Sequence, residues 1–140
     1  MRILGIDPGT AIVGYGVIEE RDERVALVTY GAIKTSPKDG DTSHRLLMIF
    51  EAINELINEY QPDSAAVEEL FFGRNITTAI KVGQARGVLL LALAMADFSN
   101  FNIGEAAFLF NKDKTSTAFL AFLSRIKLAT NLTLRGDVLK

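Results

Sequence analysis

The chain has 140 residues, of which 49% are apolar and 23% are charged. This is enough material for one globular domain with a substantial hydrophobic core. The formal net charge of −2 excludes an overall basic character, so any affinity for nucleic acid must come from a local surface patch. The chain has no cysteine, which excludes disulfides and thiolate metal sites and fits a cytoplasmic protein.

The sequence also bears on membrane association. It contains no uninterrupted apolar run of about 18 residues, from which we expect no membrane span. The N-terminus lacks a basic region followed by an apolar stretch and a cleavage site, so we expect no signal peptide.

The first predicted element is a β-hairpin. An apolar run over residues 3–6 ends at Asp7, a Pro-Gly-Thr turn follows, and residues 12–18 form a second β-rich run. This spacing predicts two antiparallel strands, the first of them central in a sheet. A buried strand tolerates an ionised side chain only where that side chain is paired or holds a metal. Asp7 is therefore either a turn former at the strand end or a site residue.

The same stretch allows a third interpretation. The pattern GIDxGT at residues 5–10 also opens the actin-like sugar kinases and chaperones, in which it is a phosphate loop. A nucleotide-binding fragment of that kind needs a second Gly-rich loop, and none follows downstream.

Four further elements are predicted in chain order. Residues 25–33 alternate as a third strand, and Thr42 or Ser43 caps a helix that runs to about residue 60. A short buried strand follows over residues 64–67, and a long helix spans residues 77–95. Small residues recur along this last helix, which suits either a core helix or close packing against a second helix.

A second carboxylate, Glu68, stands at the end of the predicted strand 64–67. Two strands of one sheet that each end in an acid bring those acids together at the sheet edge. Adjacent carboxylates repel one another unless a cation lies between them, and Mg²⁺ prefers oxygen ligands of this kind. Asp7 and Glu68 are the predicted catalytic metal ligands, and Glu69 is a weaker candidate. The alternative is a solvated acidic pair at a strand end.

Three blocks now carry a resemblance to a known family. LGIDPG at residues 4–9 followed by GYG at 14–16, VEELFF at 67–72 with Arg74 and Asn75, and TAIKVGQARG at 78–87 stand in family order. Together they resemble the RuvC family of crossover junction endodeoxyribonucleases, the bacterial Holliday junction resolvases. The resemblance covers about residues 1–97.

The resemblance implies an α/β fold of the RNase H-like type, with a mixed sheet and flanking helices. It also implies a homodimer in which the helix over residues 77–95 forms much of the interface. The implied activity is Mg²⁺-dependent symmetric nicking of four-way DNA junctions in recombination and repair, with Mn²⁺ able to substitute. A metal-activated water attacks the phosphodiester and leaves a 5′-phosphate and a 3′-hydroxyl. Branch-migration motor proteins of the same pathway are the implied partners.

The DNA contacts follow from the same resemblance. Phe71 matches an aromatic residue that stacks in the opened junction, and Arg74 matches an arginine that contacts the DNA backbone, with Asn75 beside it. Stacking on an exposed base and a guanidinium on a phosphate both suit junction binding. Core packing is the ordinary alternative for Phe71. Lys81 and Arg86 are further DNA-binding candidates, although periodicity leaves open whether they face DNA or solvent.

The resemblance stops near residue 97. The family continues with a helix that carries an Asp-x-x-Asp or His-x-x-Asp pair completing the metal site, and residues 98–140 contain no such pair. We therefore treat residues 98–140 as a divergent tail with a candidate amphipathic helix over 115–129. One hypothesis is that this tail is translated out of frame. Without the pair, nicking should be much weaker than in an intact family member, and the alternative function is a catalytically impaired junction-binding and dimerisation module.

Overall fold

The computed structural model describes residues 1–22, 24–69, 75–96 and 106–107. The elements, in chain order, are β1 (Arg2–Asp7), β2 (Ile12–Arg21), β3 (Arg24–Lys34), a 3-10 turn η1 (Pro37–Asp39), α1 (Thr42–Tyr60), β4 (Ser64–Glu69), α2 (Ile76–Met95) and β5 (Ala106–Ala107). The predicted order of hairpin, third strand, helix, strand and helix is confirmed, with bounds that differ by up to three residues. The predicted helix over residues 115–129 lies outside the described residues.

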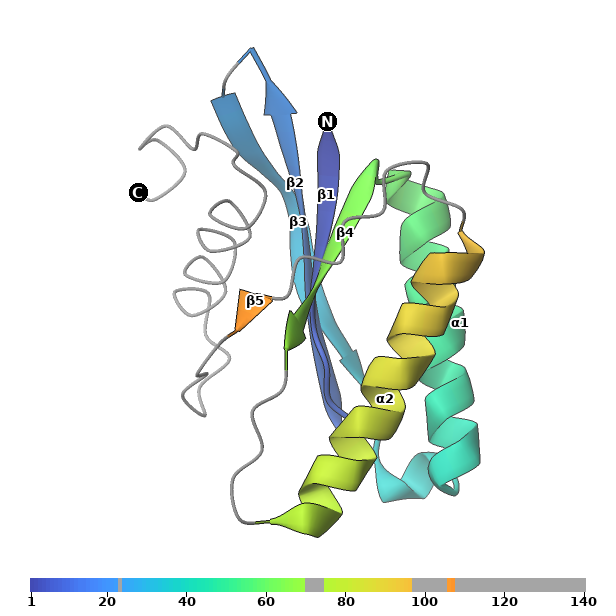
Figure 1. The fold of residues 1–140 in the computed structure, drawn as a ribbon. Coiled ribbons are helices and arrows are strands. Elements are labelled where there is room, and N and C mark those ends of the chain that lie inside the picture. The colour runs from blue at the N-terminus through green and yellow to red at the C-terminus, as the bar shows by residue number, and fades with distance from the viewer. Residues whose placement is uncertain (23, 70–74, 97–105, 108–140) are drawn as a thin grey trace.

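The described strands form one mixed sheet in the order β3-β2-β1-β4-β5. The hairpin strands β1 and β2 are antiparallel, as are β2 and β3, whereas β4 runs parallel to both β1 and β5. Both helices lie side by side on one face of this sheet (Figure 1). The predicted mixed sheet with flanking helices is therefore confirmed, and β1 is central in it.

The hydrophobic core lies between the sheet and the two helices. Alternate residues of a strand point to opposite faces, so Leu4 and Ile6 of β1 face the helices while Ile3, Gly5 and Asp7 point to the other face. The remaining buried members of the core cluster are Val13, Val17, Ile49, Ile53, Ile57, Ala65, Val67, Ala85, Leu89, Ala92 and Leu93. The alternating side-chain direction along β1 thus turns Asp7 away from the helix-facing core.

The register between β1 and β4 is fixed at the end opposite Asp7. The backbone N–H of Arg2 donates to Asp63 Oδ2 at 2.6 Å, and the N–H of Asp63 donates to the Arg2 carbonyl at 2.9 Å. The Arg2 guanidinium also donates to the Tyr60 carbonyl at the end of α1, at 2.8 Å. These contacts tie the start of both parallel strands together, so the register at their carboxyl ends is determined as well.

Both helices begin at a side-chain cap. Asp41 accepts the backbone N–H of His44 at 2.9 Å, so the predicted cap of α1 at Thr42 or Ser43 is wrong by one or two residues. Asp, Ser and Thr are all favoured helix caps, so three such residues in a row leave the position of the cap to the backbone conformation. Asn75 caps α2 by accepting the N–H of Thr78 at 3.2 Å.

Helix α2 has a buried face and an exposed apolar face. It is the one helix among the described residues that is long and apolar enough to cross a membrane by length and composition alone. Core helices often share that composition, and Ala85, Leu89, Ala92 and Leu93 of α2 are buried in the core. These four residues assign α2 to the packed domain.

Candidate functional site

The two predicted metal ligands lie side by side at the carboxyl ends of β1 and β4. Ile6 pairs with Val67 in the parallel ladder, so Asp7 and Glu68 are the next residues on neighbouring strands. Neighbouring strands are about 4.8 Å apart, and residues in register point to the same face. Asp7 is 9% exposed and Glu68 is 3% exposed. The sheet therefore brings together two largely buried carboxylates.

The chemistry of this pair suits a hard divalent cation. Burying a carboxylate is costly unless it is hydrogen-bonded, paired or bound to a metal, and two carboxylates together supply the oxygen donors that Mg²⁺ requires. Within the part of the chain that the structure describes, no group of three or more potential metal-ligating side chains occurs. The described residues thus provide two candidate ligands and no third.

The turn that follows Asp7 is held by α1 and by the end of β3. The buried Thr35 hydroxyl donates to the Thr10 carbonyl, and the Thr35 backbone N–H donates to the Ala11 carbonyl at 2.9 Å. Arg45 of α1 donates through Nε to Thr35 Oγ1 at 2.9 Å and through Nη2 to the Thr10 carbonyl at 3.3 Å. A charged donor thereby fixes the backbone three residues beyond Asp7.

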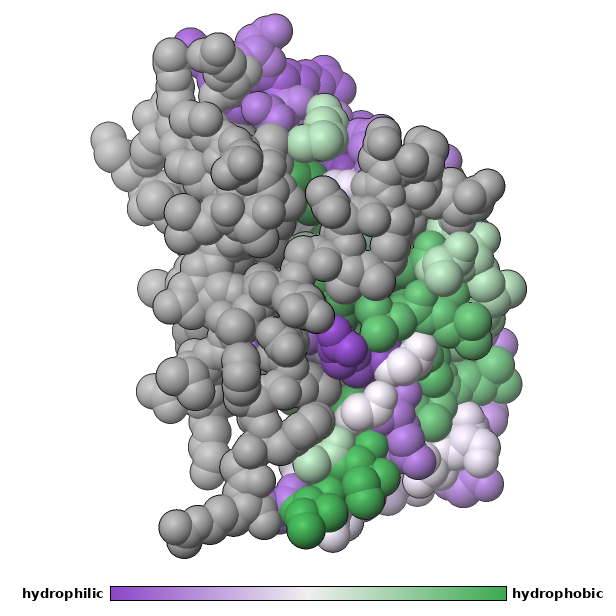
Figure 2. All heavy atoms as spheres, in the orientation of Figure 1, coloured by the Kyte–Doolittle hydropathy of each residue, from purple (hydrophilic) through white to green (hydrophobic). Residues whose placement is uncertain are grey.

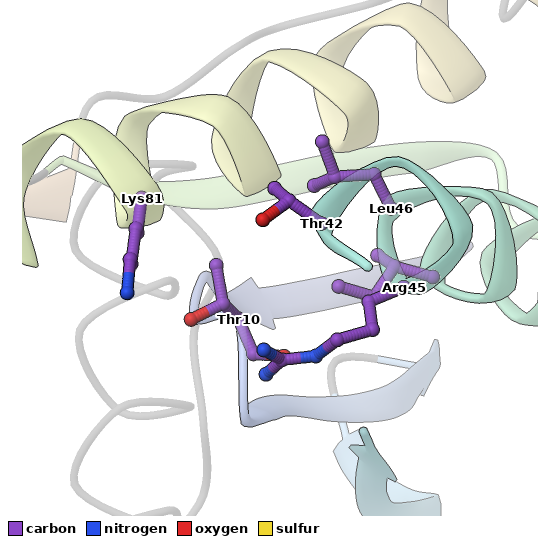
Figure 3. Close-up of a pocket in the computed structure, with 6 residues that line it drawn as sticks. Thr10, Thr42, Arg45, Leu46 and Lys81 are labelled. Carbon is purple, nitrogen blue, oxygen red and sulfur yellow. The ribbon is translucent and has the colours of Figure 1, made fainter. Parts of the chain in front are cut away.

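This turn also lines a pocket between the two helices. Its lining residues are Thr10, Thr42, Arg45, Leu46, Ile49 and Lys81. Figure 3 shows the Arg45 guanidinium reaching the turn from α1 and Lys81 extending from α2 on the other side of Thr10. Two cations from different helices therefore lie close to the turn that follows a candidate metal ligand.

We expect Arg45→Met to loosen this turn and to lower the free energy of unfolding by about 1–2 kcal/mol, since hydrogen bonds from a charged donor are lost at a half-buried position. Urea denaturation measures this change. The control is Lys38→Met, which removes a cation from the exposed η1 turn and should change the free energy by less than about 0.5 kcal/mol. Equal effects of the two substitutions would contradict the assigned role of Arg45.

Gly14 is a site residue that the sequence reasoning missed. It pairs with Asp7 across the hairpin, and a Cβ built on it would lie 3.4 Å from Asp7 Cβ and 3.5 Å from Asp7 Oδ2. A methyl group fits at that distance, whereas a larger side chain would occupy the space of the carboxylate. The four-residue connection between the strands would pair Asp7 with Ile12 in a simple hairpin, whereas the observed register pairs Asp7 with Gly14, so the sequence alone does not identify Gly14.

We expect Gly14→Val to displace the Asp7 carboxylate and to abolish stabilisation by Mg²⁺, while Gly14→Ala keeps it. The measurement is the melting temperature of each variant with EDTA and with Mg²⁺. If Mg²⁺ raised the melting temperature of the valine variant as much as that of the alanine variant, the space beside Gly14 would not be needed for Asp7 to bind the ion.

The other predicted site residues have different positions. Asn75 caps α2, and Lys81 is exposed at the pocket. Arg86 is half-buried and donates through Nε to the backbone carbonyl of Glu68 at 3.3 Å. Glu69 is the last residue of β4. Phe71 and Arg74 lie outside the described residues, so their predicted DNA contacts stay predictions.

Comparison with known proteins identifies a family. The model of the family "Crossover junction endodeoxyribonuclease RuvC" matches residues 3–106, and thus extends past residue 97 to the first residue of β5. A relative of that name from Heliobacterium modesticaldum is 54% identical over 99 residues, which are 71% of this chain and 60% of the relative. Another, from Desulfitobacterium hafniense, is 57% identical over 94 residues, or 67% of this chain and 56% of the relative. The chain therefore spans less than two thirds of the length of these relatives.

Solved structures agree with the sequence comparison. The structure described as T. thermophilus RuvC in complex with Holliday junction substrate is 32% identical, with a TM-score of 0.65 over 77% of this chain and 64% of that one. The yeast mitochondrial Holliday junction resolvase Ydc2 has a TM-score of 0.57 over 98% of this chain and 65% of that one, and its 11% identity supports a shared fold alone. The family match over residues 3–106, the close bacterial relatives and the paired carboxylates agree: this chain belongs to the RuvC family of crossover junction endodeoxyribonucleases.

Proposed function

We propose that this chain binds four-way DNA junctions and nicks them as a Holliday junction resolvase in homologous recombination and DNA repair. The observation that carries the proposal is the adjacency of Asp7 and Glu68 at the ends of two parallel strands of a RuvC-family sheet. The support for the substrate is the T. thermophilus relative, which was solved with a Holliday junction.

Asp7 and Glu68 are the proposed ligands of Mg²⁺, with Mn²⁺ as a substitute. Both are buried carboxylates on one face of the sheet, as an oxygen-liganded ion requires. When bound, the ion supplies the positive charge that activates water and stabilises the leaving oxygen in phosphodiester hydrolysis. The two residues contribute two fixed anionic donors, and the Thr10 turn and the parallel register keep them aligned.

The proposed DNA contacts come from α2 and from the segment that precedes it in the sequence. Lys81 is exposed on α2 and lines the pocket beside the Thr10 turn, so its ammonium is available to a phosphate. Asn75 is exposed at the start of α2, directly after the segment that contains Phe71 and Arg74. We assign base stacking to Phe71 and backbone contacts to Arg74, Asn75 and Lys81.

We also propose that the protein is a homodimer that associates through the exposed face of α2. Four large apolar side chains on this helix are more than half exposed: Ile76 (73%), Ile80 (58%), Leu91 (55%) and Met95 (66%). Gly83 and Gly87 fall on the same face, and a Cβ built on either would have no neighbour within 4 Å. Figure 2 shows hydrophobic surface toward both ends of α2. Such a stripe allows a second helix to approach closely.

We expect Leu91→Glu to shift the protein toward the monomer, because it places a charge within this exposed apolar face. Analytical ultracentrifugation over a concentration series measures the shift. Leu47→Glu is the matched control, since Leu47 is 48% exposed on α1 and does not belong to the stripe. A wild-type protein that stays monomeric at all concentrations would refute the dimer.

The place of action and the partners are proposed from the family alone. We place the protein in the cytoplasm of a bacterial cell, together with branch-migration motor proteins that move the junction. The support is that the relatives named above are bacterial.

A specific observation also favours a second function, a module that binds junctions without cutting them. The described residues offer two candidate metal ligands, and residues 98–140 contain no Asp-x-x-Asp or His-x-x-Asp pair. A labelled four-way junction and a linear duplex of the same sequence, each tested with EDTA and with Mg²⁺, separate the two functions. Paired symmetric nicks that require Mg²⁺ support a resolvase, whereas a salt-sensitive shift without nicks supports the binding module. Equal affinity for junction and duplex would refute both.

A further inference from the structure

The two cations of α2 have different surroundings. Lys81 is exposed, whereas Arg86, five residues later on the same helix, is half-buried. Its neighbours Ala85 and Leu89 are buried in the core, so this part of α2 is held against the sheet. The Arg86 Nε–H donates to the backbone carbonyl of Glu68 at 3.3 Å. The sequence pattern treats both residues as candidate DNA contacts, but Arg86 reaches the sheet.

The Arg86 contact lies on β4 at Glu68, which is one of the two candidate metal ligands. Glu68 pairs with Ala106 of β5 on one side, and on the other side it stands next to Asp7 of β1. The guanidinium of arginine is always charged and its planar fork is rigid, so it makes a directional donor to a carbonyl. A donor on the Glu68 carbonyl therefore restrains the backbone unit that carries one of the two site carboxylates.

We propose that Arg86 is a positioning residue that holds the Glu68 end of β4 in register with Asp7, and that it does not contact DNA. The inference rests on the proposed metal site. A metal site needs its ligands within about 0.5 Å of the productive geometry, and outer partners that hold ligands commonly change metal affinity by about 10–100-fold. Arg86 acts through the Glu68 backbone and takes no part in the reaction itself.

Two substitutions separate the hydrogen bond from the charge. In Arg86→Gln, the Nε2 amide stands at the same position along the side chain as the arginine Nε, so the donor is kept while the charge is lost. In Arg86→Met, the length is similar and both donor and charge are lost. Lys81→Gln is the control, because it removes a charge from the exposed side of the same helix.

The first readout is Mn²⁺ binding, followed by the electron paramagnetic resonance signal of the free ion, with Asp7→Asn to identify the site. We expect Arg86→Met to weaken Mn²⁺ binding by about 10–100-fold and Arg86→Gln to stay within about 3-fold of wild type. The second readout is junction affinity in EDTA. We expect both Arg86 variants to bind junctions like wild type, and Lys81→Gln to bind more weakly with a salt slope reduced by about 1.

Three results would overturn this inference without refuting the proposed metal site. The first is an unchanged Mn²⁺ affinity in Arg86→Met, and the second is an equal loss of Mn²⁺ affinity in the Gln and Met variants. The third is weaker junction binding in both variants with an unchanged Mn²⁺ affinity. If Arg86→Met does not fold while Arg86→Gln folds normally, the hydrogen bond serves the whole fold, and a role confined to the site is likewise overturned. Wild-type protein without Asp7-dependent Mn²⁺ binding would refute the proposed metal site and this inference together.

Discussion

Asp7→Asn is expected to abolish both Mg²⁺-dependent stabilisation and any junction nicking. The substitution keeps the size of the side chain but replaces a carboxylate, the protein ligand that Mg²⁺ sites usually use, with a neutral amide that lacks the negative charge. An ion present at about 100 times its Kd stabilises the folded state by about 2.7 kcal/mol, and this gain should disappear. Nicking should fall by more than the 10–100-fold that loss of an outer partner typically costs.

The measurement combines melting temperatures in EDTA and Mg²⁺ with a nicking assay on a labelled four-way junction. Glu55→Gln is the matched control, since it removes one carboxylate from the exposed surface of α1. Junction binding in EDTA should be retained by both variants, which separates loss of the ion from loss of the fold. An Asp7→Asn protein that is still stabilised by Mg²⁺ would refute Asp7 as a ligand.

The sequence predicted the sheet and its acidic edge because these depend on local patterns. A continuous apolar run marks β1, and a turn follows Asp7 at once. Glu68 stands near the end of β4, which the sequence predicts as a short buried strand. Parallel strands bring their carboxyl ends together, so the adjacency of Asp7 and Glu68 follows from the order of the elements.

The supporting contacts could not be predicted in the same way. Arg45 reaches the Thr10 carbonyl from 35 residues away, and Arg86 reaches the Glu68 carbonyl from 18 residues away. Helical periodicity says which face a residue occupies, but not whether a long side chain bends back to a backbone carbonyl or extends into solvent. From the sequence, the side chain of Arg86 could face either DNA or solvent. The structure shows a third arrangement, in which it donates to the Glu68 carbonyl.

Leu89→Ala is expected to lower the free energy of unfolding by about 2–5 kcal/mol, a large share of the 5–15 kcal/mol typical of a domain. Leu89 is fully buried in the cluster that joins α2 to α1 and the sheet. Its removal leaves a cavity in the layer that supports Arg86. Chemical denaturation monitored by circular dichroism measures the change, which should not depend on protein concentration.

Leu91→Ala is the matched control for this prediction. It makes the same chemical change two residues later, about 200° around the helix, at a side chain that is 55% exposed. In a dilute monomer it should change the free energy of unfolding by less than about 0.5 kcal/mol. If α2 forms the dimer interface, its effect should instead grow with protein concentration, because the dimer loses apolar contact area. Equal, concentration-independent effects of the two substitutions would contradict both the buried face and the exposed face assigned to α2.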